Sequence, residues 1–316
     1  MSRYVSPIKK KDPMLKENEI TKVIKDKGPL TGAELLDAVS GDPLLLWRAS
    51  RLSKDLAIRT VGTRYLRLDR RIEGYARLSP SILREFLTYS VIGLSRDYPS
   101  LVRRADQLLS HIEEVSRAKS EMAYSIVSAL VSRLANEVLI EEKVCIIIAG
   151  DIVYNMAHDV PRPERSTGKL VKGSDMDIVV IVEDLFPDEL MERLDEEIYK
   201  EKYRLLINPY LREEIDYIVK DLDRVRKQVK FDTFKHIVAC KILHEGTLLY
   251  GSDELFHKVK MMVREHGVIK KIDAMEGKAR IFRREAEEYL LREDPRKIRE
   301  ESLYLFYPTE ETEEFE

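Results

Sequence analysis

The sequence predicts a multidomain protein of the α+β or α/β class. Apolar residues recur at helical spacing in the amino-terminal segment, in residues 101–140 and again after residue 253. Between residues 143 and 250, short runs of apolar and β-branched residues alternate with helical segments, a pattern typical of a layered α/β domain. The chain has 316 residues, 44% of them hydrophobic, which is enough for two modest cores.

The amino-terminal segment, residues 13–75, is expected to form three helices followed by a β-hairpin. The helices are predicted from Leu15 to Gly28, from Thr31 to Val39 and from Leu44 to about Leu56. Thr31 and Glu34 have the spacing of a capping box. Two runs rich in β-formers, 58–61 and 65–68, flank Gly62-Thr63 and predict the hairpin. This order of elements resembles a winged helix-turn-helix domain.

Positive charge is concentrated in this segment. Residues 1–75 carry 16 Lys and Arg against 10 Asp and Glu, a net +6, so the rest of the chain carries −9 of the total of −3. The residues expected to contact nucleic acid are Arg48, Arg51 and Lys54 on the third helix and Arg64 and Arg67 on the hairpin. Cations on one side of a recognition helix and a wing suit a phosphate backbone and would make the segment DNA-binding. Winged helices also serve as protein adaptors, so both interpretations stay open.

The rest of the chain divides into four further segments. We expect a helical connector at 76–118, the α/β domain at 119–253, a helical carboxyl-terminal region at 254–309 and an acidic tail at 310–316. Within the α/β domain, strands are predicted at 144–149, 176–182, 203–207 and 214–219, and helices at 187–200 and 231–249. The tail is acidic and is expected to be frayed.

Two aspartates stand at the start of a strand that reads as buried. Asp175 and Asp177 precede and begin the apolar run 178–182, so alternation places both side chains on one face. Close carboxylates repel one another unless a cation lies between them. A hard divalent ion such as Mg²⁺, often bound together with substrate phosphates, suits this position. The pattern therefore predicts metal-assisted phosphoryl or nucleotidyl transfer.

The surrounding residues resemble the DNA polymerase β superfamily of nucleotidyltransferases. The family pattern is a strand ending in Gly-Gly or Gly-Ser, an Asp-x-Asp pair opening a second strand, and a third acid on a later strand. The matching residues here are Ala149-Gly150-Asp151, then Gly173-Ser174-Asp175-Met176-Asp177, and then Asp216, with Glu214 as the alternative third acid. The resemblance covers roughly residues 120–255 and implies a mixed sheet with flanking helices.

The resemblance also implies a mechanism with two Mg²⁺ or Mn²⁺ ions and a nucleoside triphosphate as substrate. Asp175 and Asp177 would bridge both ions, and Asp216 would complete the shell of the ion that activates the acceptor hydroxyl. Gly150 would let the backbone approach the triphosphate. Ser174 would either contact phosphate or cap the turn. The acceptor would be RNA, a protein side chain or a small molecule.

Two features depart from the family pattern. Asp151 stands where Ser or Gly is usual, and it would repel a triphosphate unless it caps a helix or joins the metal shell. The segment between Gly150 and Asp175 is also longer than usual. It carries four cations that could bind the triphosphate or could belong to an ordinary surface loop: Arg162, Arg165, Lys169 and Lys172. A second Gly-Ser-Asp at 251–253 lacks a following apolar run, so we expect Asp253 to cap a helix.

Composition limits the classes of protein to which this chain can belong. No apolar run is long enough to span a membrane, and the first residues lack an apolar signal core, so a cytoplasmic protein without a membrane partner is expected. Charged residues make up 35% of the chain and amides are few, which fits a thermophile. The rival to a transferase is a DNA-binding regulator with an inactive nucleotidyltransferase-like domain, and a third possibility is an adaptor protein.

Overall fold

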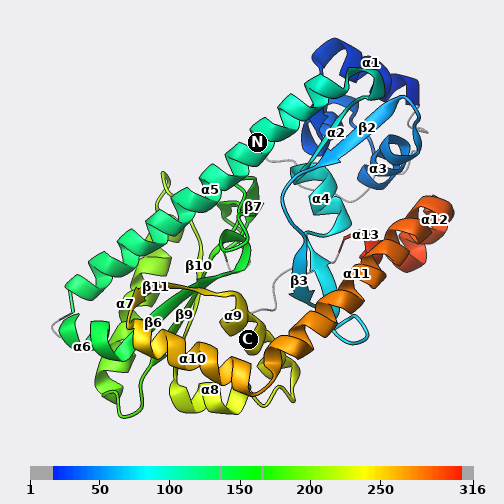
Figure 1. Ribbon diagram of the computed structural model, residues 1–316. Coiled ribbons are helices and arrows are strands. Elements are labelled where there is room, and N and C mark those ends of the chain that lie inside the picture. Colours follow the sequence, from blue (N-terminus) through cyan, green and yellow to red (C-terminus); the bar gives the residue numbers. More distant parts are fainter. Residues whose placement is uncertain (1–16, 135–136, 165–166, 308–316) are drawn as a thin grey trace. The chain divides into compact units, whose positions relative to one another are not determined.

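The computed structural model describes residues 17–134, 137–164 and 167–307, and it divides the chain into two compact units (Figure 1). The described residues of the first unit are 17–61, Ser81–Gln107 and 286–307. The described residues of the second unit lie within Gly62–Pro80 and Leu108–Glu285. Each unit is thus built from separated stretches of the chain. The tail at 310–316 and Arg165 lie outside the described residues. No described helix has both the length and the apolar character to cross a membrane.

The first unit combines short helices with a three-stranded antiparallel sheet. Its elements are α1 (Glu17–Lys27), β1 (Leu30–Thr31), α2 (Gly32–Val39), α3 (Pro43–Leu52), β2 (Leu56–Thr60), α4 (Ile82–Thr88), β5 (Ser90–Leu94), η1 (Ser95–Asp97), α12 (Pro295–Lys297), η3 (Ile298–Ser302) and α13 (Leu303–Phe306). The strand order is β1-β5-β2. The predicted capping box is confirmed, because the Thr31 side chain accepts from the Glu34 N–H and the Glu34 side chain accepts from the Thr31 N–H.

The predicted hairpin around Gly62-Thr63 is wrong. β2 pairs with β5, whereas β3 (Tyr65–Leu68) pairs with β4 (Ala76–Ser79). The reason is burial: Leu66, Leu68 and Leu78 on this second pair of strands belong to the apolar core of the second unit. Gly62-Thr63 is therefore the place where the chain passes from the first unit to the second. The helical connector expected at 76–118 is likewise helical only in part, because it begins with strand β4, followed by α4 and strand β5.

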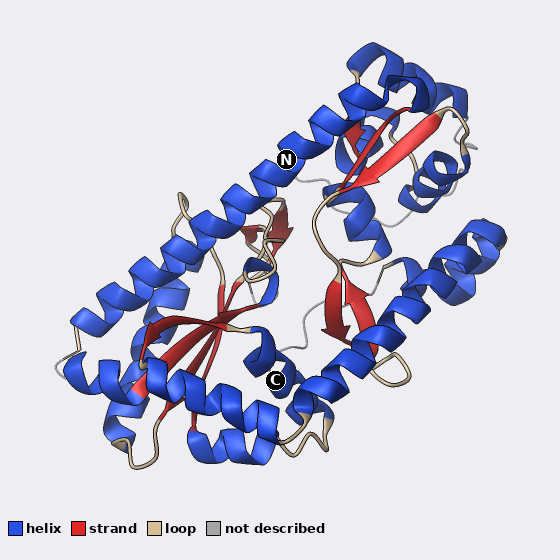
Figure 2. Ribbon diagram, in the orientation of Figure 1, coloured by secondary structure: helices blue, strands red, loops and turns tan. Residues whose placement is uncertain are grey.

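The second unit contains a four-stranded mixed sheet with strand order β10-β9-β6-β11 (Figure 2). Its strands are β6 (Val144–Ala149), β9 (Met176–Val182), β10 (Ile215–Asp221) and β11 (Thr247–Gly251). β9 and β10 run parallel, while β6 is antiparallel to both β9 and β11. The continuous apolar runs of β6 and β9 follow from burial on both faces, since every residue of these two strands is buried.

Helices cover both faces of this sheet. One face packs with α5 (Tyr98–Ser132), α6 (Glu137–Lys143) and α7 (Asp188–Ile207), and its core contains Val127, Ile146, Ile178 and Leu194. The other face packs with α8 (Leu222–Gln228), α9 (Phe234–Glu245), α10 (Asp253–Glu265) and α11 (Val268–Arg292). The α+β class with a mixed sheet and flanking helices is therefore observed.

Three predicted segments of the second unit change in detail. The strand expected at 203–207 is wrong, because α7 continues to Ile207 with Leu205 buried on its inner face. The helix expected at 231–249 ends at Glu245 and is followed by β11. In the second Gly-Ser-Asp, Ser252 is the residue that caps α10, and Asp253 is its first helical residue. The long segment before Asp175 contains η2 (Gly150–Ile152) and a small hairpin of β7 (Pro161–Pro163) and β8 (Leu170–Lys172).

Candidate active site

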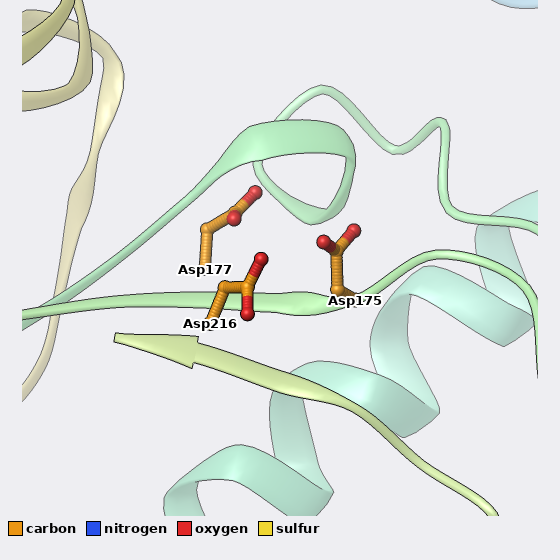
Figure 3. A group of neighbouring side chains, drawn as sticks. All are labelled: Asp175, Asp177 and Asp216. Atoms are coloured by element: carbon orange, nitrogen blue, oxygen red, sulfur yellow. The ribbon is translucent and has the colours of Figure 1, made fainter. Parts of the chain in front are cut away.

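Three aspartates meet on one face of the four-stranded sheet (Figure 3). The parallel pairing of β9 with β10 makes Asp177 and Asp216 register partners, and Asp175 immediately precedes β9. Each of the three side chains offers a carboxylate oxygen that lies within 4.8 Å of the other two. The acids expected from the sequence are therefore brought together. Glu214, the alternative third acid, is not part of this group.

The glycine at the end of β6 makes room for the group. Ala149 pairs with Asp177 across the sheet, and Gly150 follows with a φ of +71°. A Cβ atom on Gly150 would lie 1.9 Å from the Asp177 Oδ2 atom, and a side chain would also be strained at this φ. The close approach that Gly150 permits in this structure is thus to the Asp177 carboxylate.

Arg162 and Lys202 are cations that contact these acids. Arg162 on β7 has its Nη2 atom 3.5 Å from Asp175 Oδ1 and 2.9 Å from Glu214 Oε2, and its Nε donates to the Gly173 carbonyl at 2.7 Å. Lys202 on α7 places Nζ 2.8 Å from Asp216 Oδ1. One cation of the long segment therefore reaches the acids. Arg162 therefore has three polar partners in this structure: Asp175, Glu214 and the Gly173 carbonyl.

The electrostatics of the site reflect surplus negative charge. Although 27% of the Asp175 side chain is exposed, desolvation is the largest cause that raises its pKa, with Asp216 and Asp151 adding to the rise and Arg162 opposing it. Burial, followed by repulsion from Asp175 and Asp216, outweighs Arg162 and raises the pKa of Glu214 to about 7. Bound cations would relieve this repulsion.

Asp151 is tied to hydroxyl groups. The Ser174 hydroxyl donates to Asp151 Oδ2 at 2.7 Å, and the Tyr65 hydroxyl donates to Asp151 Oδ1. Tyr65 in turn accepts from the Ser79 hydroxyl at 3.2 Å. Asp151 thereby joins the β3–β4 hairpin to the turn that carries Asp175. This contact gives a structural reason for an aspartate at position 151.

A second buried network supports Gly150. Lys241 and Glu245 form an ion pair in which Nζ lies 2.8 Å from Oε2, with about 5% and 4% of their side chains exposed. Glu245 also accepts from the Tyr154 hydroxyl at 2.6 Å and from the Gly150 N–H at 3.4 Å. The rings of Tyr154 and Tyr65 stack with centroids 4.0 Å apart, so the two networks adjoin.

The other residues that were expected to bind the nucleotide contact residues outside the group of three aspartates. Gly173 has a φ of +64°, and a Cβ there would lie 1.7 Å from the His158 carbonyl oxygen, so this turn requires glycine. Ser174 is buried and accepts from the His158 N–H at 3.2 Å. Lys172 donates to the Tyr210 carbonyl at 2.9 Å, and Lys169 is exposed. Arg162 is the member of the predicted basic group that the structure joins to the acids.

The residues expected to contact nucleic acid are split between the units. Arg48, Arg51 and Lys54 belong to the first unit. Arg64 and Arg67 belong to the second unit, where Arg64 directly precedes β3 and Arg67 lies on it. Arg48 is half-buried, donates to the Leu290 carbonyl, and has a pKa that desolvation lowers. Arg51 and Lys54 are exposed. The helix cations and the hairpin arginines therefore belong to different units, and their contact with nucleic acid stays a prediction.

Sequence reasoning missed five residues of the site. They are Lys202, Tyr65, Tyr154, Lys241 and Glu245. Lys202 was missed because the helix was expected to end at residue 200 and a strand was expected at 203–207. The helical spacing of Leu194, Ile198 and Leu205 is the signal that could have predicted the longer helix. The other four join the site through long-range packing, which leaves no signal in a local pattern.

The donor set suits a hard divalent cation. Three carboxylates, two on strands and one directly before β9, supply the oxygen ligands that Mg²⁺ or Mn²⁺ prefers, and the part-exposed Asp175 and Asp216 leave a side open for a substrate. Such a site can hold metal and polyphosphate together.

Comparisons of this chain with protein-family models, with curated proteins and with solved structures gave no match.

Proposed function

We propose that the second unit is a metal-dependent nucleotidyltransferase, which moves a nucleoside monophosphate from a nucleoside triphosphate to an acceptor hydroxyl. The observation that supports this most directly is the convergence of Asp175, Asp177 and Asp216 beside a strand-ending glycine. In the reaction the acceptor oxygen forms a bond to the α-phosphorus, the bond from that phosphorus to its β-bridging oxygen breaks, and pyrophosphate leaves.

Each side chain has a role in the proposed reaction. Asp175 and Asp177 would hold the ions, and Asp216, register partner of Asp177, would accept the acceptor's proton on a carboxylate oxygen. Bound Mg²⁺ or Mn²⁺ would lower the pKa of the attacking hydroxyl and offset charge on the leaving pyrophosphate. Arg162, now paired with Asp175 and Glu214, would turn toward the triphosphate when metal neutralises Asp175.

The first unit favours an acceptor linked to nucleic acid. Helices α1, α2 and α3 with the antiparallel sheet β1-β5-β2 have the element types of a winged helix, with β3, β4 and α4 inserted between β2 and β5. Exposed Arg51 and Lys54 on and after α3 are available to phosphate groups. We therefore rank RNA or another nucleic acid above a protein or small-molecule acceptor.

The test incubates the full chain with each α-labelled nucleoside triphosphate, Mg²⁺ or Mn²⁺, and RNA, protein or small-molecule fractions of an extract. The expected result is release of pyrophosphate and transfer of label, with the labelled material lost on nuclease treatment. Asp177→Asn and Asp175→Asn should each lower the rate by at least about 100-fold, because each removes a charged ligand.

Asp253→Asn is the matched control, because it changes the second Gly-Ser-Asp, where the aspartate is exposed and begins α10. It should keep the parental rate. Equal rates for Asp177→Asn and Asp253→Asn would contradict the proposed catalytic group. Binding of a triphosphate without any pyrophosphate release would instead favour the rival hypothesis of an inactive domain in a regulator.

A further inference from the structure

A basic cavity lies on the same face of the sheet as the three aspartates, farther along the strands. Val179 and Ile218, which are register partners, line the cavity. They follow Asp177 and Asp216 by two residues each, so strand alternation puts all four side chains on one face. Lys220, two residues beyond Ile218, also lines it. The cavity has a volume of about 200 Å³ and is formed entirely within the second unit.

The polar lining is strongly cationic. Five Lys or Arg side chains and one histidine line the cavity, with no carboxylate among the lining residues: Arg70, Lys220, Arg224, Lys227, Lys235 and His236. Two of them have acidic partners outside the cavity, since Lys227 pairs with Asp223 at 2.6 Å and His236 with Asp232 at 2.6 Å. Among the described residues, none forms a salt bridge with Lys220, Arg224 or Lys235.

Lys220 is the most informative member of this group. Only 3% of the residue is exposed, and its Nζ donates to the Gln228 side-chain oxygen at 2.8 Å, a neutral acceptor. Desolvation, with Arg224 adding repulsion, lowers its pKa to about 7. A buried ammonium without a counter-ion is costly, so an anion bound beside Lys220 would stabilise its charged form.

The opposite wall is apolar and aromatic. Phe234, Val238 and Ile242 of α9 line it, and the Arg70 guanidinium lies 4.8 Å from the centroid of the Phe234 ring. This contact brings the β3–β4 hairpin to the cavity. Guanidinium and ammonium groups that converge beside a flat apolar wall suit a compact phosphate group and the organic group it carries.

We propose that this cavity is a second anion site, which binds a phosphate group separately from the three aspartates. The phosphate would accept hydrogen bonds from Lys220, Arg224 and Lys235 and provide the negative charge that the lining lacks. The occupant is either inorganic phosphate or the phosphate monoester of a nucleotide. The proposal does not depend on the proposed catalysis, because none of these cations belongs to the acidic group.

The test is isothermal titration of the full chain with inorganic phosphate and, separately, with a nucleoside monophosphate. EDTA keeps divalent ions away from the aspartates, and the pH is kept below the Lys220 pKa of about 7. Saturable binding is expected, and Arg224→Ala and Lys235→Ala should each weaken it by about tenfold. Tighter binding of the monophosphate identifies a nucleotide as the source, and equal affinities identify inorganic phosphate.

Lys270→Ala is the control, because Lys270 is an exposed lysine of α11 that is not among the residues lining the cavity. It should bind phosphate as the parent does. Lys220→Met tests whether the buried cation contributes to phosphate binding, and thermal melting checks that this variant folds. If it does not fold, Arg224→Ala and Lys235→Ala test the proposal in its place. Absence of saturable binding, or equal weakening by the Lys270 and Arg224 substitutions, would overturn the proposal.

Discussion

Asp177 and Asp216 are register partners on adjacent parallel strands, so hydrogen bonds of the sheet fix the separation of their carboxylates. Asp175 is one residue outside β9 and is oriented instead by a turn whose Ser174 is buried. The group therefore has two rigid members and one that depends on its loop. Substitutions in the loop should act mainly through Asp175, whereas those at strand ends should disturb the whole group.

The first prediction concerns Gly150→Ala. The new Cβ would lie 1.9 Å from Asp177 Oδ2 at a φ of +71°, so the carboxylate must move and the backbone is strained. We expect the free energy of unfolding to fall by about 1–3 kcal/mol and transfer to be nearly lost. Urea unfolding and pyrophosphate release measure the two effects.

The control is Gly277→Ala in α11, where no heavy atom lies within 4 Å of the added Cβ. Alanine in a helix interior should raise stability there by about 0.5–1 kcal/mol and leave transfer unchanged. A Gly150→Ala protein with parental stability and activity would refute the close approach described for Asp177.

The second prediction concerns Lys202→Gln. Lys202 lies 2.8 Å from Asp216, and its charge opposes a divalent ion at the same carboxylate. Its removal should tighten Mn²⁺ binding several-fold, as measured by titration calorimetry. Lys200→Gln on the same helix is the control, because Lys200 pairs with Glu197 and should leave Mn²⁺ affinity unchanged. Weaker Mn²⁺ binding by Lys202→Gln would show that the lysine organises the site instead of competing with metal.

Local patterns predicted the acidic group and three strands of the mixed sheet, β6, β9 and β10, but missed β11 and placed a strand at 203–207 where α7 continues. The apolar run 178–182 matches β9, and the Asp-x-Asp spacing places two carboxylates correctly, because alternation in a strand is a local property. Alternation alone does not separate Asp216 from Glu214, because residues two apart share a strand face; the pairing of β10 with β9 separates them, since Asp216 is the register partner of Asp177. The acidic group could be predicted from the sequence, and of its cationic neighbours Arg162 was among the predicted residues whereas Lys202 was not.

Pairings between distant segments were not predictable in the same way. β2 and β3 both read as strands, but their partners are β5 and β4, and the choice depends on which core receives Leu66 and Leu68. Likewise, the contacts of Tyr65 with Asp151 and of Glu245 with Gly150 join residues far apart in the chain. Tertiary packing decides such contacts, and it leaves no fixed spacing in the sequence.

The third prediction concerns the carboxyl-terminal helices, which the sequence suggested were a separate region. Phe306 is 2% exposed and its ring centroid lies 5.6 Å from that of Trp47 in α3, within the core of the first unit. Phe306→Ala should therefore lower the free energy of unfolding of this unit by about 3–5 kcal/mol. Tyr304→Ala, at a residue that is 56% exposed, should change it by less than about 0.5 kcal/mol. Equal effects in urea unfolding would place the helix outside that core.

The fourth prediction concerns stability above neutral pH. Burial lowers the pKa of Lys220 to about 7 and that of Lys260 to about 8, from an ordinary value of 10.5. Above pH 7 the unfolded chain therefore binds more protons at these lysines than the folded chain, so stability should rise with pH. Burial also raises the pKa of Cys145 and Cys240 to about 12 from 9.0, which reverses the sign for the thiols.

The sum of these effects is a rise in the free energy of unfolding from pH 7 to pH 9, followed by a flatter region where the thiols offset the lysines. Lys220→Met should remove part of the rise, at most about 1.4 kcal/mol per pH unit, while Lys260 retains the rest. Arg224 and Gln228, which face Lys220, do not titrate in this range. Urea unfolding at several pH values measures the slope. Identical slopes for the parent and Lys220→Met would mean that Lys220 keeps its ordinary pKa, because a lysine protonated in both states contributes nothing between pH 7 and pH 9.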